Sequence, residues 1–145
     1  MRTAAVLAPL VAGALLQGCS PGPGEVASPN AAPPAEVVQI EGSDRSKVTL
    51  TEDAERRLGI KTETARAAGG TSLIVVPVAA LIYDTAGQTW VYTTTERRTF
   101  FRQAVTVARI EGDNAILQSG LASGAPVVTV GGAELLGAEY GVEGE

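Results

Sequence analysis

The fold of this chain is decided by residues 90–110, which read WVYTTTERRTFFRQAVTVARI. Residues 90–92 are aromatic and β-branched and lead into three threonines, a composition that favours a strand. The polar residues 96–98 connect this run to residues 99–110, which form the longest candidate strand in the chain. Two strand patterns joined by a short polar connection predict β structure here.

Alternation along residues 99–110 divides the side chains between two faces of the predicted strand. We expect the core to meet the face that carries Phe101, Gln103, Val105 and Val107. The opposite face carries Phe100, Arg102, Ala104, Thr106 and Ala108. This assignment places Arg102 away from the core.

Further short strand patterns lie on both sides of this stretch. They cover residues 47–50, 60–65, 73–76, 81–83, 115–117 and 126–130, and turn residues separate most of them. Regular short strands with turns at intervals of about 8 to 12 residues predict a mainly β fold, a small barrel or sandwich. Because aromatic residues are only 4% of the chain, the core is expected to consist of Val, Ile, Leu and Ala.

Residues 51–59 predict one short surface helix. Thr51 is a suitable N-cap, acidic residues follow it, and Gly59 can adopt the left-handed conformation that ends a helix. Arg56 and Arg57 fall in the last turn, where they could bind a partner, although compensation of the helix dipole is the favoured interpretation. Near the C-terminus, residues 133–136 predict a single helical turn closed by Gly137.

The N-terminus has the layout of a secretory signal peptide, predicted to cover residues 1–18. Arg2 precedes an apolar run at residues 4–16 that is too short to span a bilayer. The sequence LLQGC at residues 15–19 resembles a bacterial lipobox, in which cleavage precedes Cys19 and the Cys19 thiol receives lipid. An ordinary signal peptide or an uncleaved anchor is the alternative. The lipobox predicts an extracytoplasmic protein that is attached through Cys19 to membrane lipid, in the periplasm or on the outer face of the cell membrane.

Residues 19–46 are predicted to be a disordered, lipidated tether. They hold five of the eight prolines, interleaved with Gly, Ala, Ser and Asn, and cannot bury enough apolar surface to offset chain entropy. Within this segment, residues 37–40 fit a short strand. The folded domain is therefore expected at residues 47–145, beginning near Lys47.

The composition excludes several classes of function. The chain has no His and one Cys, so it lacks the residues for Ser-His or Cys-His catalysis, His-ligated metal sites and thiolate zinc sites. Its net charge of −5 disfavours nucleic acid as a partner. We therefore expect neither an enzyme, nor a cofactor, nor a metal.

Two further motifs favour structural roles. The glycine-rich helix start at residues 131–134 lacks a nearby Lys or Arg, so it is a poor phosphate site. Four acidic residues could form a hard-cation site or an acid/base pair, namely Asp84, Asp113, Glu134 and Glu139. Asp84 and Asp113 lie in turns beside Gly or Asn, where a carboxylate usually caps its own backbone.

One basic stretch is the candidate partner-binding edge. It comprises Arg97, Arg98, Phe100 and Arg102. Solubility and protection of a strand edge are the alternative role for these residues. Strand alternation separates Arg102 from Arg109, which argues against a continuous face for nucleic acid.

The order of these patterns resembles a known family. The segments that carry the resemblance are VTLT at 48–51, LGIKT at 58–62, VPVAALIYD at 76–84, GQTWVY at 87–92, FRQAVTV at 101–107 and SGLASG at 119–124. They are similar in order and spacing to the C-terminal, membrane-proximal domain of periplasmic adaptor subunits, the membrane fusion proteins of resistance-nodulation-division efflux transporters. The resemblance covers residues 47–140.

The chain departs from complete adaptors between residues 65 and 73. The few residues there leave no room for the lipoyl domain or the helical hairpin of that family. The resemblance therefore implies a lipid-anchored β domain that associates with a membrane efflux transporter and scaffolds or modulates it. The alternative is a free-standing envelope lipoprotein that binds a small ligand or stabilises the envelope.

Overall fold

The computed structural model describes residues 32–141 of the 145-residue chain. The signal peptide, Cys19 and the first part of the predicted tether lie outside the described residues. Residues 32–141 belong to one compact unit, and it is mainly β. The prediction of a mainly β fold is confirmed.

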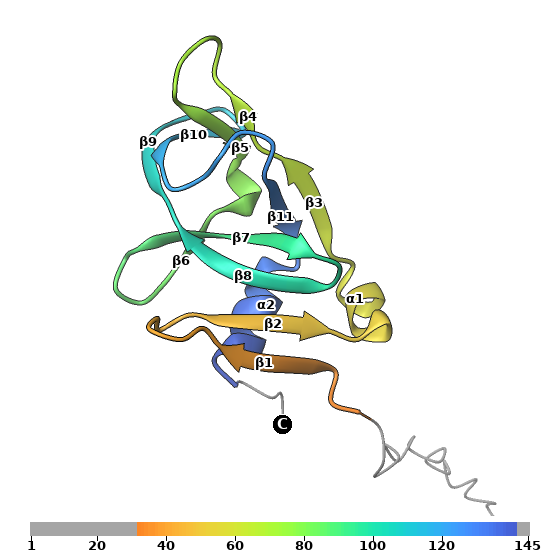
Figure 1. Cartoon of the computed structure of the whole chain (residues 1–145). Coiled ribbons are helices and arrows are strands. Elements are labelled where there is room, and N and C mark those ends of the chain that lie inside the picture. The colour runs from red at the N-terminus through yellow and green to blue at the C-terminus, as the bar shows by residue number, and fades with distance from the viewer. Residues whose placement is uncertain (1–31, 142–145) are drawn as a thin grey trace, which may run out of the picture. The chain divides into compact units, whose positions relative to one another are not determined.

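Two helices, a 3₁₀ turn and a series of short strands follow one another along the described chain (Figure 1). Their order is β1 (Ala35–Gln39), β2 (Ser46–Leu50), α1 (Glu52–Leu58), β3 (Lys61–Thr64), β4 (Arg66–Ala67), β5 (Ile74–Pro77), η1 (Val78–Ala80), β6 (Ile82–Tyr83), β7 (Thr89–Glu96), β8 (Thr99–Ala104), β9 (Thr106–Glu111), β10 (Asn114–Ser119), β11 (Pro126–Val130) and α2 (Gly132–Glu139).

The strands form two antiparallel sheets. The larger sheet has the order β1-β2-β8-β7-β11-β3, with β6 added beside β7. The smaller sheet has the order β4-β5-β10-β9. Both are open sheets of short strands, an arrangement compatible with the small sandwich that was one of the two predicted architectures.

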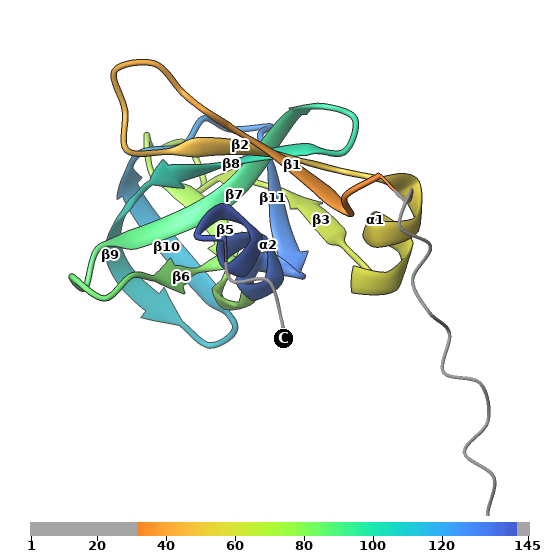
Figure 2. The same cartoon turned by 90° about the horizontal axis from the view of Figure 1, so that it is seen from below.

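Strand β7 supplies side chains to two hydrophobic clusters. Val91 packs with Val127 and residues of the smaller sheet such as Leu117, whereas Tyr92 packs with Val48 and with Leu135 of α2. Because neighbouring residues of a strand point to opposite faces, β7 is covered on both sides. Figure 2 shows α2 lying against the large sheet, with β6 beside it.

Helix α1 confirms the predicted capping residues. The Thr51 side chain accepts a hydrogen bond from the Ala54 backbone N–H at 3.2 Å, and Gly59 ends the helix with φ +61°. Acidic residues lie in the first turn, and Arg56 and Arg57 lie in the last. These positions suit the helix dipole.

The folded part begins earlier than predicted. Strand β1 starts at Ala35 rather than near Lys47 and pairs with β2 from Ala35↔Leu50 to Gln39↔Ser46. The predicted tether therefore extends too far, and the strand pattern at residues 37–40 was the correct indication. The five prolines that marked the predicted tether all precede β1, and the last of them is Pro34.

The predicted inward face of β8 is wrong. Phe100 and Arg102 are each 2% exposed, whereas Phe101 and Gln103 are only half-buried. Each face of the strand carries one phenylalanine, Phe100 or Phe101, so hydrophobicity did not distinguish the faces. The face with Arg102 was assigned to solvent because arginine is usually exposed. Arg102 is inside because a buried acidic partner meets it there, as described below.

The predicted long strand is also broken into two. Strand β8 ends at Ala104 and β9 begins at Thr106, while the Val105 backbone N–H donates to the Thr89 carbonyl at 3.0 Å. Val105 is 3% exposed, and Val107 packs partly buried against the same cluster. The chain thus passes from the large sheet to the small one at Val105.

Helix α2 is longer than the predicted single turn. It runs from Gly132 to Glu139 and passes through Gly137, which does not end it. Its N-cap is Gly131, at φ +90°, and a Cβ added there would overlap Ile60 Cδ1. Gly131 therefore allows both the turn into α2 and close packing of the β11–α2 junction on Ile60.

We predict that Gly131→Ala lowers the free energy of unfolding by about 1 kcal/mol more than Gly124→Ala, a modest difference because the obstructing atom is the mobile end of the Ile60 side chain. Both glycines have a positive φ, +90° and +88°, so the backbone strain is matched. Only Gly131 has a neighbour in the path of the new methyl group. Urea denaturation of the two variants measures the difference, and equal losses would show that Ile60 yields without cost.

Candidate functional site

The structure divides the predicted partner-binding edge. Arg97 is exposed and Arg98 is half-buried, at the turn between β7 and β8, and Arg98 has φ +62°. Phe100 and Arg102 are buried in β8, so neither is part of an accessible edge. Arg97 and Arg98 are therefore the members that remain on the surface.

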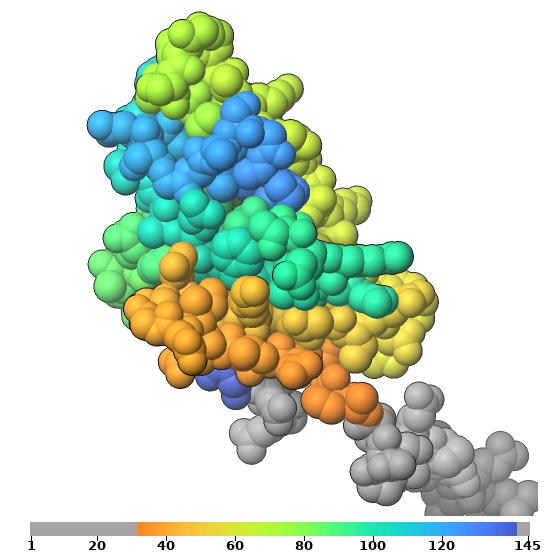
Figure 3. Space-filling model, viewed as in Figure 1, coloured from red at the N-terminus to blue at the C-terminus, as the bar shows by residue number. Residues whose placement is uncertain are grey.

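A pocket of about 330 Å³ lies beside this turn, and we call it the hairpin pocket. Figure 3 shows the tip of the β7–β8 hairpin projecting next to α1. The residues that line the pocket are Glu55, Ile60, Thr62, Thr94, Thr95, Glu96, Arg97, Arg98 and Phe100. Arg97, Arg98 and Phe100 of the predicted edge thus meet here, without Arg102.

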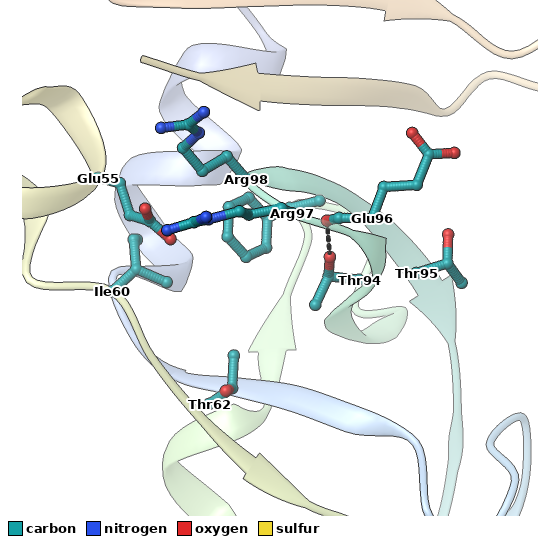
Figure 4. Close-up of a pocket in the computed structure, with 9 residues that line it drawn as sticks. Glu55, Ile60, Thr62, Thr94, Thr95, Glu96, Arg97 and Arg98 are labelled. Atoms are coloured by element: carbon teal, nitrogen blue, oxygen red, sulfur yellow. Dashed lines mark hydrogen bonds between the residues drawn. The ribbon is translucent and has the colours of Figure 1, made fainter. Parts of the chain in front are cut away.

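The hairpin pocket combines charges of both signs with an apolar base. In Figure 4 the Arg97 side chain extends toward Glu55 and Ile60. Arg98 Nη1 lies 3.3 Å from Glu52 Oε2, and Thr94 Oγ1 donates to the Glu96 carbonyl at 2.5 Å. These side chains are exposed or half-buried, so they are available for polar contacts at the surface.

Sequence reasoning missed a buried polar cluster beneath α2. Arg102 Nε donates to Glu139 Oε2 at 2.8 Å, and the two side chains are only 3% and 2% exposed. Tyr92 Oη donates to the same oxygen at 2.6 Å, and the Ser46 backbone N–H donates to Glu139 Oε1 at 3.0 Å. The Glu139 carboxylate is therefore held by three donors from three strands.

Aromatic rings extend this cluster toward the surface. The Arg102 guanidinium carbon lies 4.7 Å from the centre of the Trp90 ring and 5.2 Å from that of Tyr140. Arg102 Nη1 also donates to Tyr140 Oη at 3.2 Å, and Trp90 Nε1 donates to Asp84 Oδ2 at 2.9 Å. A chain of contacts thus connects Glu139 to Asp84.

Asp84 confirms the predicted turn role and adds a second one. Its Oδ1 accepts from the backbone N–H groups of Ala86 and Gln88 at 2.9 and 2.8 Å, which fixes the turn between β6 and β7. Its Oδ2 accepts from Trp90. The predicted option of an acid/base pair finds no support, because Glu139 is bound to Arg102 instead.

The surroundings of these groups set their protonation. Burial and the hydrogen bond to Glu139 raise the pKa of Tyr92 far above its ordinary value. Burial by itself would lower the pKa of Arg102, but Glu139 raises it overall. The hydrogen bond from Trp90 lowers the pKa of Asp84. Tyr92 is therefore neutral, and Arg102 and Asp84 are charged, at neutral pH.

The cluster links the end of α2 to three strands of the large sheet. Its central carboxylate is 2% exposed and accepts three hydrogen bonds. Within residues 32–141, no group of three or more His, Cys, Asp or Glu is placed to hold a metal ion. In the same residues, no helix is long and apolar enough to cross a membrane.

A second pocket, of about 390 Å³, lies next to this cluster, and we call it the tyrosine pocket. It is lined by Tyr83, Asp84, Thr85, Leu136 and Tyr140. Tyr83 and Tyr140 are 57% and 59% exposed, so much of the surface of both rings is open to solvent. The only signal for this site in the sequence was Asp84, which was assigned to its turn.

No protein-family model, curated protein or solved structure matches this chain. The residues and their geometry therefore carry the functional assignment.

The buried ion pair leads to a prediction about stability. Glu139→Gln should lower the free energy of unfolding by about 3 to 5 kcal/mol, because it leaves the Arg102 charge buried without its counterion. The double variant Arg102→Met/Glu139→Gln should lose less than the sum of the two single variants. Urea denaturation of all four proteins completes the cycle.

An exposed ion pair provides the control. Arg109 and Glu111 lie 2.5 Å apart with side chains 54% and 58% exposed, so Glu111→Gln should cost less than about 0.5 kcal/mol. If the losses in unfolding free energy of the two single variants at Arg102 and Glu139 simply add in the double variant, the two side chains are not coupled and the prediction is wrong.

Tyr92 leads to a prediction about pH. Its pKa is raised in the folded state, so above the unfolded-state value of about 10 the unfolded chain loses a proton that the folded chain keeps. Stability should therefore fall as pH rises beyond about 10, by roughly 1.4 kcal/mol per pH unit from this group. Tyr92→Phe should flatten that part of the pH profile, measured by urea denaturation, even though it is less stable at neutral pH. An unchanged slope would mean that Tyr92 ionises in the folded protein.

Proposed function

We propose that this chain is a lipid-anchored extracytoplasmic protein that associates with a membrane efflux transporter as a non-catalytic adaptor. The lipobox pattern ending at Cys19 and the resemblance of residues 47–140 to adaptor domains support the proposal. The structural observation that carries it is the hairpin pocket, where an exposed arginine stands over an apolar base beside α1.

The hairpin pocket has the composition of a protein-docking site. Arginine is enriched at interfaces because its fork donates to carboxylates and backbone carbonyls at once. Arg98 already pairs with Glu52, whereas Arg97 has no ion-pair partner among residues 32–141. Arg97 is thus the cation that a partner's carboxylate would meet, while the half-buried Ile60 offers apolar contact beside it.

The anchor limits where docking occurs. If lipid is attached at Cys19, the chain between Cys19 and β1 reaches at most about 55 Å even when fully extended. The β domain then stays near the membrane surface. A partner must present its docking face within that distance, as the extracytoplasmic part of a membrane transporter does.

A free-standing lipoprotein that binds a small ligand is the second candidate. The tyrosine pocket favours it, because exposed aromatic rings around a concave site are typical of ligand binding. The two functions use different surfaces and are compatible in one protein.

The adaptor proposal predicts the result of a membrane pull-down with the tagged full-length chain. The wild-type chain should recover a transporter, and Arg97→Glu should reduce that recovery at least about tenfold, because it replaces the docking cation with an anion. Arg66→Glu is the matched control, since Arg66 is an exposed arginine on β4 in the other sheet. Quantitative mass spectrometry of the recovered proteins measures the ratio.

Two outcomes would overturn the adaptor proposal. One is that the wild-type chain recovers no transporter component, and the other is that Arg66→Glu loses as much as Arg97→Glu. The anchor is tested in the same preparations, because Cys19→Ala should leave the membrane fraction. If that variant stays with the membrane, the lipobox interpretation is wrong.

A further inference from the structure

The tyrosine pocket has walls that the fold holds in place. One wall is the turn between β6 and β7, fixed by the two backbone bonds to Asp84 Oδ1 and by a bond from the Gly87 N–H to the Asp84 carbonyl at 3.0 Å. The other wall is the end of α2, which the Glu139 contacts attach to the sheet. The site is therefore formed before any ligand arrives.

The charges around the tyrosine pocket leave an excess of negative charge. Asp84 accepts hydrogen bonds from Trp90, Ala86 and Gln88, and all three donors are neutral. The nearby Arg102 is neutralised by its ion pair with Glu139. Asp84 is thus a carboxylate without a bonded counterion, at the edge of a pocket of about 390 Å³.

The aromatic residues here already stack on one cation. The Arg102 guanidinium lies within 5.2 Å of the centres of both the Trp90 and Tyr140 rings. Aromatic faces attract cations through the ring quadrupole, and the attraction is stronger where water is partly excluded. Tyr83 and Tyr140 remain more than half exposed, so their ring surface is available to a second cation from solution.

From this combination we propose that the tyrosine pocket binds a monovalent organic cation with an apolar body, such as an aryl or alkyl ammonium. The ammonium lies against Asp84 and the rings of Tyr83 and Tyr140, and the apolar body contacts Leu136. A metal ion is disfavoured because Asp84 is the one carboxylate in the lining. An anion is disfavoured because it would face that carboxylate. The proposal does not depend on the adaptor function.

The chain has one tryptophan, which provides the readout. Trp90 donates to Asp84, so a ligand at Asp84 alters the surroundings of the indole and its fluorescence. The experiment titrates the full chain, in nonionic detergent, with benzyltrimethylammonium, benzyl alcohol and benzenesulfonate. These three probes share an aromatic ring and differ in charge.

We expect saturable binding of benzyltrimethylammonium in the millimolar range or tighter, and at least about tenfold weaker binding of the other two probes. Tyr83→Ala should weaken binding of the cation at least about fivefold, because it removes an exposed ring that the core does not need. Asp84→Asn should weaken it at least as much. Ile110→Ala, which truncates an exposed apolar residue on β9, is the control and should leave binding unchanged.

Asp84→Asn could disturb the turn, so Tyr83→Ala carries the test if that variant unfolds. The proposal is overturned if no saturable signal appears with the cation, or if all three probes bind equally. It is also overturned if Tyr83→Ala binds as the wild type does. None of these results bears on transporter recovery through Arg97, so the two proposals fail separately.

Discussion

The ion pair between Arg102 and Glu139 is the interaction on which the arrangement of this domain depends. It joins the last residue of α2 to the middle of β8, and the Tyr92 hydroxyl and the Ser46 N–H complete the shell of the carboxylate. Burying two charges is costly unless every donor and acceptor is satisfied, and no buried side-chain polar atom in the described part of the chain lacks a partner. Because these requirements are directional, α2 is restricted to one position on the sheet, which hydrophobic contact by itself would not specify.

The predictions from sequence that were right concern elements held by local contacts. Helix α1 and the β6–β7 turn depend on contacts between residues a few positions apart, such as Thr51 with Ala54 and Asp84 with Ala86. Contacts between residues so close in the chain can be predicted from the sequence. The ion pair between Arg102 and Glu139 joins residues far apart in the chain, and no local sequence pattern predicts it. The reversed face of β8 and the attachment of the end of α2 to the sheet both follow from that one missed contact.

Coverage of both faces of the large sheet explains why the orientation of its strands was hard to predict. Alternation of polar and apolar residues identifies the inner face of a strand only when the other face meets water. In β7, Val91 faces one hydrophobic cluster and Tyr92 faces the other, so both sides read as apolar. In β8 the second covered face includes an arginine, which sequence rules assign to solvent. Hydrophobic patterning could therefore predict that these residues are strands, while leaving their orientation undetermined.

The two candidate surfaces lie at opposite ends of β7. Its first residue, Thr89, pairs with Tyr83 of the tyrosine pocket, and its last residue, Glu96, lines the hairpin pocket. At about 3.3 Å per residue, the strand separates them by more than about 20 Å, so a protein docked at Arg97 need not cover Asp84. Residues along the same strand are rigidly connected, and Tyr92 lies between the two sites with its hydroxyl on Glu139. A change in the contacts that hold α2 on the sheet would therefore alter the tyrosine pocket first, because α2 forms one of its walls. The hairpin pocket would change less, because its turn is bound to α1 through Arg98 and Glu52.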